Sequence, residues 1–454
     1  MSAAPPFAGL RRVASDSAAA HALANPVDAA TRATAQAIVD EVRAGGEAAL
    51  RAVAARFGDL PSAEAPLVLD RAAMGAVHAA LPAAQRALLA RVAARVRAFA
   101  QAQRAALGDV DVAIPGGRAG HTVAPCASAG CYAPGGRYPL PSSVLMTAVT
   151  ARVAGVKTVW VASPRPLPIT VAAAFEAGAD ALLCVGGAQA IAALAYGVGG
   201  CPPCDVIVGP GNRFVTAAKS IVAGHCAIDM LAGPSECLVL ADGAADARLV
   251  AADLLAQAEH DTDALPVLVT TSAALADAVD AQLVAQLAVL PTRAVAAVSV
   301  AKGFCVVCAS LEEAAAVTDR LAPEHLEVQV APADVDALWA RLANYGGLFL
   351  GAGTAEVFGD YGAGPNHVLP TSGTARYTGG LSVFTFLRVR TWLRAGGAAG
   401  AGQDQAGLDL LVRDSAALAR LEGLYGHEAA ALARGSDAVL AEIAREKEEE
   451  QRAT

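Results

Sequence analysis

Apolar residues follow two different spacings along the chain. In residues 28–107 they recur every three or four positions, as at Ile38, Val42, Leu50 and Val53, which is the period of an α-helix. We therefore predict a helical N-terminal region. From about residue 131, short β-branched runs alternate with helical stretches; the runs are Thr158–Ala162, Ala181–Val185, Val206–Val208, Leu238–Leu240 and Val267–Val269. This alternation predicts βαβ units, and hence an α/β fold with mostly parallel sheets covered on both faces.

Three further stretches bear on the organisation of the chain. Ala181–Cys204 carries no formal charge over a length that could span a bilayer. Its Gly-Gly and Pro-Pro pairs instead predict a strand, a turn, a helix and a loop in a buried core, so we expect no membrane partner. The Gly/Ala-rich tract Ala395–Gly407 is predicted to link a final helical element, and the charged run Arg445–Arg452 to be a solvated helix terminus.

Composition narrows the class of protein. The 454 residues are enough for two or more lobes. A net charge of -9 without clustered cations argues against nucleic acid as a partner and favours small-molecule chemistry. The nine cysteines are an odd number, and the N-terminus has no apolar leader, so we expect a reducing, cytoplasmic setting. Met1–Arg12 lacks acidic residues, which leaves a transit peptide, and a plastid in a eukaryote, as the alternative.

Two C-x-x-C pairs, Cys201 with Cys204 and Cys305 with Cys308, have the ligand spacing of half a zinc ribbon. About a hundred residues separate the pairs, and the second lies in a strand-like run in which positions three apart face opposite sides of the sheet. We therefore interpret all four as packing thiols.

Acid, amide and imidazole groups concentrate in three islands of the second half of the chain. Gln257 and His260 are three apart on a helical stretch and project from one face. Together with Asp360 they could offer oxygen and nitrogen ligands to a divalent metal. The adjacent Glu324 and His325 form an acid/base pair. The alternative for Glu324 is that Pro323-Glu324 caps a helix.

Three glycine-containing loops lie between a predicted strand and a predicted helix, where open α/β sheets hold ligands. They are Cys131–Gly136, Val185–Gln189 and Gly209–Asn212. None is a G-x-G-x-x-G sequence, so each could be a βα turn that needs glycine only for its backbone angles. Tyr132, Gln189 and Asn212 nevertheless offer hydrogen bonds from one edge, which favours a binding role.

Five motifs, taken together and in order, resemble the histidinol dehydrogenase family. The resemblance extends from about Pro26 to Ala430, and the motifs are Ile207–Asn212, Ile228–Glu236, Gln257–His260, Ala322–Glu327 and Asn366–Thr371. It implies an enzyme that uses zinc and two NAD molecules to oxidise L-histidinol, through L-histidinaldehyde, to L-histidine, in the last steps of histidine biosynthesis.

The resemblance also assigns roles to individual residues. Zinc is expected on Gln257, His260, Asp360 and His427 of the partner subunit. His325 is expected to act as the base, and Glu324 to activate the water that the second oxidation consumes. NAD is expected at Tyr132, Gln189 and Asn212. The substrate is expected to be lined by Ser235, Gln257, His260, His325, Asp360, Glu422 and His427, while His367 is either a further substrate contact or a structural residue of a Gly-rich turn.

The resemblance implies two incomplete Rossmann-like domains with small helical arms in an intertwined homodimer. The expected boundaries are an N-terminal arm at 1–24, a first domain at 25–130 with 235–380, an inserted NAD domain at 131–234, and a C-terminal arm at 381–454. Two alternatives remain: oxidation of another small polar alcohol such as sulfopropanediol, and a zinc- or dinucleotide-binding protein without catalysis. Arg137, Tyr138 and Arg213 depart from the family pattern, and a cation there could favour the 2′-phosphate of NADP.

Overall fold

The computed structural model describes residues 7–22, 27–60, 62, 64–135, 138–396 and 404–453. The chain forms two compact units, one comprising Met1–Arg104 with Pro125–Phe386 and the other Ala105–Ala124 with Leu387–Thr454. Arg137 and most of the Gly/Ala tract before Asp404 lie outside the described residues.

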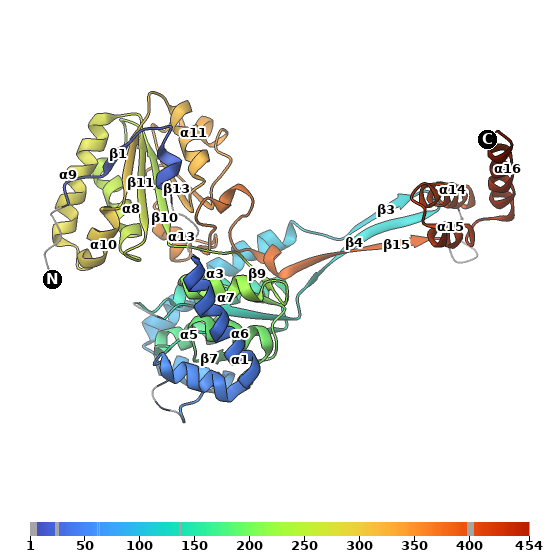
Figure 1. Ribbon diagram of the computed structural model, residues 1–454. Coiled ribbons are helices and arrows are strands. Elements are labelled where there is room, and N and C mark those ends of the chain that lie inside the picture. Colours follow the sequence, from blue (N-terminus) through green and yellow to red (C-terminus); the bar gives the residue numbers. More distant parts are fainter. Residues whose placement is uncertain are drawn as a thin grey trace. The chain divides into compact units, whose positions relative to one another are not determined.

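The first unit contains a six-stranded, fully parallel sheet, here called the first sheet. Its order is β1 (Arg11–Val13), β12 (Phe304–Val307), β11 (Leu265–Thr270), β10 (Glu236–Ala241), β13 (His325–Gln329) and β14 (Gly347–Leu350). One face packs on α8 (Ala247–Ala258), α9 (Ala273–Val289) and α10 (Arg293–Val300), and the other on α11 (Leu311–Leu321) and α12 (Val335–Trp339) (Figure 1). Further elements are η1 (Ala18–His21), α13 (Glu356–Asp360), η2 (Thr374–Arg376) and η3 (Val383–Phe386).

A second six-stranded sheet, here called the second sheet, lies in the same unit. Its order is β2 (Val68–Asp70), β7 (Ala181–Leu183), β6 (Thr158–Ala162), β5 (Ser128–Tyr132), β8 (Val206–Val208) and β9 (Ala227–Ile228), and only β2 runs antiparallel to its neighbour. The helices of this region are α1 (Ala29–Arg56), α2 (Arg71–Ala80), α3 (Ala83–Ala105), α4 (Pro141–Ala154), α5 (Pro168–Glu176), α6 (Gly187–Tyr196) and α7 (Arg213–Val222). Helix α1 packs on α6 and α7, and α2 packs on α5.

The second unit combines a three-stranded sheet with three helices. The strand order is β15 (Leu387–Ala395), β4 (Gly117–Pro125) and β3 (Val110–Ile114). The helices are α14 (Gln405–Leu421), α15 (Tyr425–Leu432) and α16 (Asp437–Ala453). Val412, Val439 and Ile443 form a small buried cluster among them.

The α/β fold with parallel sheets is confirmed, and the run Thr158–Ala162 is strand β6 with the predicted bounds. The stretch Ala181–Cys204 is strand β7, a turn, helix α6 and a loop, as predicted. None of the described helices is both long and apolar enough to cross a membrane. All nine cysteines are buried, and the two C-x-x-C pairs hold free thiols that adjoin different sheets, as expected of packing thiols.

Strand pairing departs from the expected domain boundaries in three places. Strand β1, expected in an N-terminal arm, is an edge strand of the first sheet. Strand β2 interrupts the predicted helical region and joins the second sheet, not the first. The β3–β4 hairpin belongs to the second unit. Strands of three to five residues carry too few positions for a hydrophobic period to show, so the pattern of the N-terminal region revealed only its helices.

Candidate active site at the amino edge of the first sheet

His325 is the first residue of β13, at the amino edge of the first sheet. Helix α11 ends just before it, with Ala322 in the left-handed region at φ 48°. The ring is 4% exposed, and its Nδ1 lies 2.9 Å from the carbonyl oxygen of Glu236, the first residue of the neighbouring strand β10. A carbonyl only accepts, so Nδ1 carries a proton, and Nε2 holds the lone pair whenever the ring is neutral. Nε2 is buried and has no hydrogen-bond partner among the described residues.

Buried carboxylates surround the His325 ring. Glu324 and Glu356 lie 3.6 and 3.8 Å from its Nδ1, and Asp360 Oδ1 lies 3.8 Å from its Nε2. Burial alone would lower the pKa of His325, but the charges of Glu324, Glu356 and Asp360 outweigh it and raise the pKa well above its ordinary value. Burial in turn raises the pKa of Glu324 to about 8 and that of Glu356 to about 7. The carboxyl groups of this cluster can therefore take up and release protons near neutral pH.

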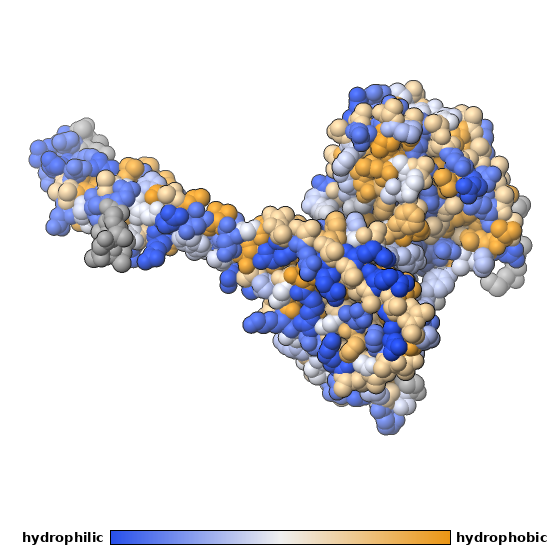
Figure 2. Space-filling view, turned by 180° about the vertical axis from the view of Figure 1, so that it is seen from behind, coloured by the Kyte–Doolittle hydropathy of each residue, from blue (hydrophilic) through white to orange (hydrophobic). Residues whose placement is uncertain are grey.

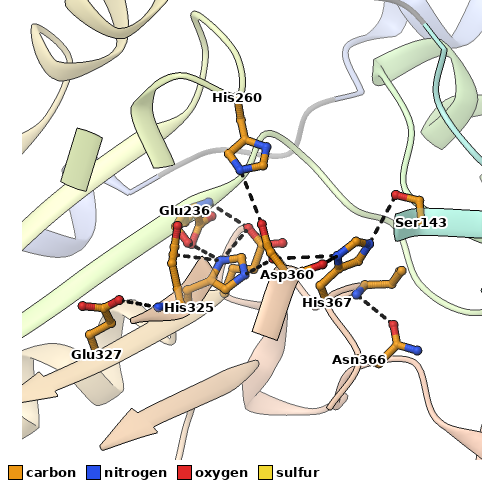
Figure 3. Close-up of polar contacts among 11 residues, drawn as sticks. Ser143, Glu236, His260, His325, Glu327, Asp360, Asn366 and His367 are labelled. Carbon is orange, nitrogen blue, oxygen red and sulfur yellow. Dashed lines mark hydrogen bonds and ion pairs between the residues drawn. The ribbon is translucent and has the colours of Figure 1, made fainter. Parts of the chain in front are cut away.

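The Asp360 carboxylate lies among three imidazole groups (Figure 3). It lies 3.5 Å from His260 Nε2, and 3.8 Å from both His325 Nε2 and His367 Nδ1. Burial would raise the pKa of Asp360, yet the neighbouring imidazoles of His260, His325 and His367 outweigh it and hold the pKa well below its usual range. An ionised carboxylate ringed by imidazoles is a donor set that suits zinc.

His367 and Asn366 join the loop after α13 to helix α4. His367 Nδ1 donates to the Asp360 carbonyl at 3.0 Å, and its Nε2 lies 3.2 Å from Ser143 Oγ. Asn366 Nδ2 donates to the Met146 carbonyl at 2.9 Å. Figure 3 shows these contacts beside Asp360. Both ring nitrogens of His367 are thus engaged, so its ring links the loop after α13 to helix α4.

Gln257 lies near the end of α8, three residues before His260, and is 1% exposed. Its amide nitrogen is placed to donate to the two Glu356 carboxylate oxygens, at 3.2 and 3.3 Å, in the orientation that the hydrogen-bond network requires. That orientation turns the amide oxygen away from Glu356. Gln257, His260 and Asp360 therefore bring an oxygen, a nitrogen and a carboxylate donor to one region, which fits a zinc ion.

A different trio, Cys237, Glu327 and Glu356, has ligand atoms within 4.8 Å of one another. All three side chains are buried. Glu327 accepts from Glu356 N at 2.7 Å and from Gln329 Nε2 at 2.8 Å, and burial raises its pKa to about 9. Burial also raises the pKa of Cys237 well above its ordinary value. These groups hold protons and internal hydrogen bonds, so we interpret the trio as part of the buried acid cluster behind His325.

The three residues expected to contact NAD lie at the carboxyl edge of the second sheet. Tyr132 ends β5, and its hydroxyl oxygen accepts from Gly187 N at 3.1 Å. Gln189, in the first turn of α6, donates through Nε2 to Asp59 at 2.8 Å. Asn212 is the N-cap of α7, where its Oδ1 accepts from Phe214 N at 3.0 Å. All three lie at the edge that the sequence indicated, and each makes a hydrogen bond within the chain.

The remaining expected site residues lie apart along the chain. Ser235 directly precedes β10 and is half-buried. Glu422 is the C-cap of α14 and His427 lies in the first turn of α15, both exposed and both in the second unit. Large apolar side chains near them are exposed as well, among them Leu421 at 85% and Tyr425 at 69%. Figure 2 shows hydrophobic residues of this kind at the surface among polar ones.

The sequence analysis missed several buried charged groups at the amino edge of the first sheet and the carboxyl edge of the second sheet. Glu236 accepts from Ser372 N at 2.6 Å, and burial raises its pKa to about 7. Lys219 and Asp229 form an ion pair whose side chains are 2% and 0% exposed. An isolated acid within an apolar strand was the available signal for Glu236 and Glu327, because a strand buried on both faces otherwise has no place for a charge.

Two features are typical of an α/β dehydrogenase. The sheets are mostly parallel and carry ligand-type residues at their edges, and a cluster of imidazoles and carboxylates surrounds a histidine nitrogen without a partner. The sequence profile of histidinol dehydrogenase matches residues 24–435. The chain therefore belongs to the histidinol dehydrogenase family.

Relatives that match most of this chain support the family assignment. A histidinol dehydrogenase from Cereibacter sphaeroides is 48% identical over 79% of this chain and 83% of its own. A sulfopropanediol 3-dehydrogenase from Ruegeria pomeroyi is 40% identical over 88% of this chain and 91% of its own. The crystal structure of histidinol dehydrogenase from Elizabethkingia anophelis has a TM-score of 0.85 at 28% identity, covering 94% of this chain and 98% of that one.

Proposed function

We propose that the protein catalyses the zinc-dependent, NAD-linked oxidation of L-histidinol, through L-histidinaldehyde, to L-histidine. The observation that carries the proposal is the state of His325: Nδ1 is fixed by the Glu236 carbonyl, and Nε2 is buried without a partner beside Asp360. A substrate hydroxyl is the group that such a nitrogen can receive. Loss of hydride from an alcohol carbon requires removal of the hydroxyl proton, and His325 Nε2 would accept it.

Glu324 is proposed to serve the second oxidation. Histidinaldehyde must add water before it can lose a second hydride, and a carboxylate with a raised pKa is a suitable proton acceptor near neutral pH. Glu324 Oε2 is held by Glu236 N at 2.8 Å. Its Oε1 has no hydrogen bond to any residue that the structure describes, so it is the atom we assign to the water.

Gln257, His260 and Asp360 would hold the zinc ion, joined by His427 of the partner subunit. Bound there, zinc would take the neutral imidazole and amine nitrogens of histidinol and so orient the alcohol carbon. Glu422 would accept a hydrogen bond from the substrate amine, and Ser235 would contact the substrate from the start of β10. This assignment makes the homodimer the working unit, because a single chain would not complete its own site.

NAD is proposed to bind at the carboxyl edge of the second sheet, at Tyr132, Gln189 and Asn212. Each residue lies at the end of a parallel strand or the start of the following helix, which is the usual ligand position in such sheets. This proposal places the chemistry at the first sheet and the dinucleotide at the second sheet.

Oxidation of another small polar alcohol is the second candidate, because a sulfopropanediol 3-dehydrogenase is among the relatives. A sulfonate would need a cation close to zinc. The groups paired with Asp360 in the described part of the chain are three histidines and neither lysine nor arginine. This favours a substrate with neutral nitrogen donors.

The test is steady-state NADH formation by zinc-loaded protein with histidinol and, separately, with sulfopropanediol. We expect turnover with histidinol that is lost on chelation and restored by zinc. Turnover with sulfopropanediol alone would replace the proposed substrate. Binding of histidinol without NADH formation would support a non-catalytic zinc- or dinucleotide-binding protein.

A further inference from the structure

Asp59 is a buried carboxylate that the proposed function does not use. It follows α1, whose end is fixed locally because Gly58 adopts φ 69°. Gly58 N donates to the Ala55 carbonyl at 3.0 Å, and Asp59 N donates to the Ala54 carbonyl at 2.8 Å. This pair of bonds is the Schellman arrangement of a helix C-terminus. Since α1 packs on α6, the arrangement delivers Asp59 to the loop before α6.

The Asp59 carboxylate fixes that loop. Its Oδ2 accepts from Gly186 N at 3.0 Å and from Gln189 Nε2 at 2.8 Å, and the residue is 5% exposed. A carboxylate only accepts, so the Gln189 amide must turn its nitrogen toward Asp59 and its oxygen away. Gln189 Oε1 then lies against Gly187, where an added Cβ would stand 2.7 Å from it. Gly187 adopts φ 64°, so glycine is needed there for two reasons.

Tyr132 completes this arrangement. Its hydroxyl oxygen accepts from Gly187 N at 3.1 Å, which leaves the hydroxyl hydrogen free to donate. Burial raises the pKa of Tyr132 to about 12, and the charge of Asp59 acts in the same direction. Around the loop Gly186–Gln189 the chain therefore gathers a phenol donor, an amide acceptor and a negative charge, on side chains that are at most 5% exposed. These groups match sugar hydroxyls and oppose a phosphate.

The loop before α7 has the opposite electrostatic character. Asn212 caps that helix with a neutral amide oxygen, and the next residue, Arg213, is an exposed cation stacked on Phe214 at 5.2 Å. Anionic groups of a dinucleotide are therefore favoured at Asn212–Arg213 and disfavoured at Asp59.

We propose that Asp59 is a positioning and specificity residue of the dinucleotide site: it fixes the Gly186–Gln189 turn and disfavours the 2′-phosphate of NADP. The inference rests on the proposed binding of NAD at the second sheet. Two like charges a few ångströms apart in a partly buried site repel strongly enough to change affinity tenfold or more.

The test uses fluorescence titration of NADH and NADPH into zinc-loaded, full-length protein. Asp59→Asn keeps an oxygen that can accept from both Gly186 N and Gln189 Nε2 but removes the charge. We expect its preference for NADH over NADPH to fall at least tenfold, with NADH affinity within about threefold of wild type. Asp59→Ala removes both acceptors and should weaken NADH binding about tenfold or more.

Asp205 supplies the matched control. Its Oδ2 also accepts from two backbone donors, Ala127 N at 2.6 Å and Ser128 N at 3.1 Å, but at the amino edge of the second sheet. Asp205→Asn should leave the NADH/NADPH preference unchanged. Zinc content and thermal unfolding, measured on every variant, show that each is folded.

An Asp59→Asn protein with the wild-type preference would overturn the specificity role, and an Asp59→Ala protein with wild-type NADH affinity would overturn the positioning role. The titration requires no turnover. Wild-type protein that binds NADH but does not oxidise histidinol would contradict the proposed function alone, whereas protein that binds neither dinucleotide would contradict both.

Discussion

The two mainly parallel sheets of the first unit carry their proposed site residues at opposite edges. In the first sheet the chemistry gathers at the amino edge, where Glu236 and His325 begin β10 and β13. In the second sheet the expected ligand contacts gather at the carboxyl edge, where Tyr132 ends β5 and glycine loops follow β7 and β8. Ligands of open α/β sheets usually lie at the carboxyl edge. At the first sheet Gln257 lies near the end of α8, while His260 lies in the turn after the helix rather than on it as expected, so both residues are also at the amino edge.

The edges also differ in what their buried acids do. At the first edge, burial raises the pKa values of Glu236, Glu324 and Glu356 to about 7, 8 and 7, so these groups can exchange protons near neutral pH. At the second edge, Asp59 and Asp229 accept from backbone N–H groups of Gly186 and Gly209, at 3.0 and 2.7 Å. We therefore expect the buried acids of the first edge to serve proton transfer and those of the second edge to hold the shape of its loops.

The largest expected effect concerns zinc and the shared site. His260→Ala and His427→Ala should each abolish turnover, because each removes a proposed ligand. Mixing the two variant chains should return about a quarter of the wild-type activity, since half of the dimers are mixed and each has one intact site. The measurement is NADH formation after joint refolding. No recovery in verified mixed dimers would contradict a site completed by the partner.

His325→Asn should come next, with a loss of about 10²–10⁴-fold in kcat, because asparagine cannot act as the base. NADH binding at the second sheet should be unaffected, which separates the two edges. His78→Asn is the matched control: His78 lies on α2, 3.4 Å from Glu176, away from the Asp360 cluster. A parallel loss of NADH affinity in His325→Asn would mean that the edges are not independent.

A smaller effect on turnover, but a large one on stability, is expected for Lys219→Met. Lys219 pairs with Asp229, and its Nζ donates to the Gly209 carbonyl at 3.0 Å. Removing it leaves a buried carboxylate unpaired, which typically costs about 3–5 kcal/mol of unfolding free energy. We also expect a several-fold rise in KM for NAD with little change in zinc affinity.

Lys302→Met is the control for that prediction. Lys302 pairs with Asp263 at 2.5 Å, but the two side chains are 47% and 66% exposed. Exposed pairs contribute about 0–1 kcal/mol, so its chemical denaturation midpoint should hardly move. If both lysine variants lost stability equally, burial would not be the reason for the effect at the second edge.

The sequence predicted the parallel α/β fold because long helices and buried β-branched runs have clear periods. It also singled out Glu324, His325 and Asp360, because polar residues stand out in an apolar chain, and the structure brings these three side chains together. It could not find the short strand β2, which pairs with β7 over only three residues. Nor could it show that Glu236, from the motif before β10, would hold Nδ1 of His325, because that contact spans 89 positions.

The Asp59–Gln189 bond illustrates the same limit. It joins residues 130 positions apart, and only the packing of α1 on α6 creates it. The sequence did contain a local signal, since Gly58-Asp59 follows a helix and predicts a C-terminal turn. A turn residue is not by itself a functional one, so the role appears only when the partner across the fold is known.

The central claim is that His325 and Glu324 divide the two oxidations at the first edge. Single-turnover NADH formation by Glu324→Gln, started from histidinol and separately from histidinaldehyde, tests it most directly. Glutamine keeps the shape and an acceptor for Glu236 N but cannot activate water. We predict that the aldehyde step slows by about 10²-fold or more while the alcohol step stays close to wild type. Slowing of the alcohol step alone, or of neither step, would contradict the account and make Glu324 a partner that only orients His325.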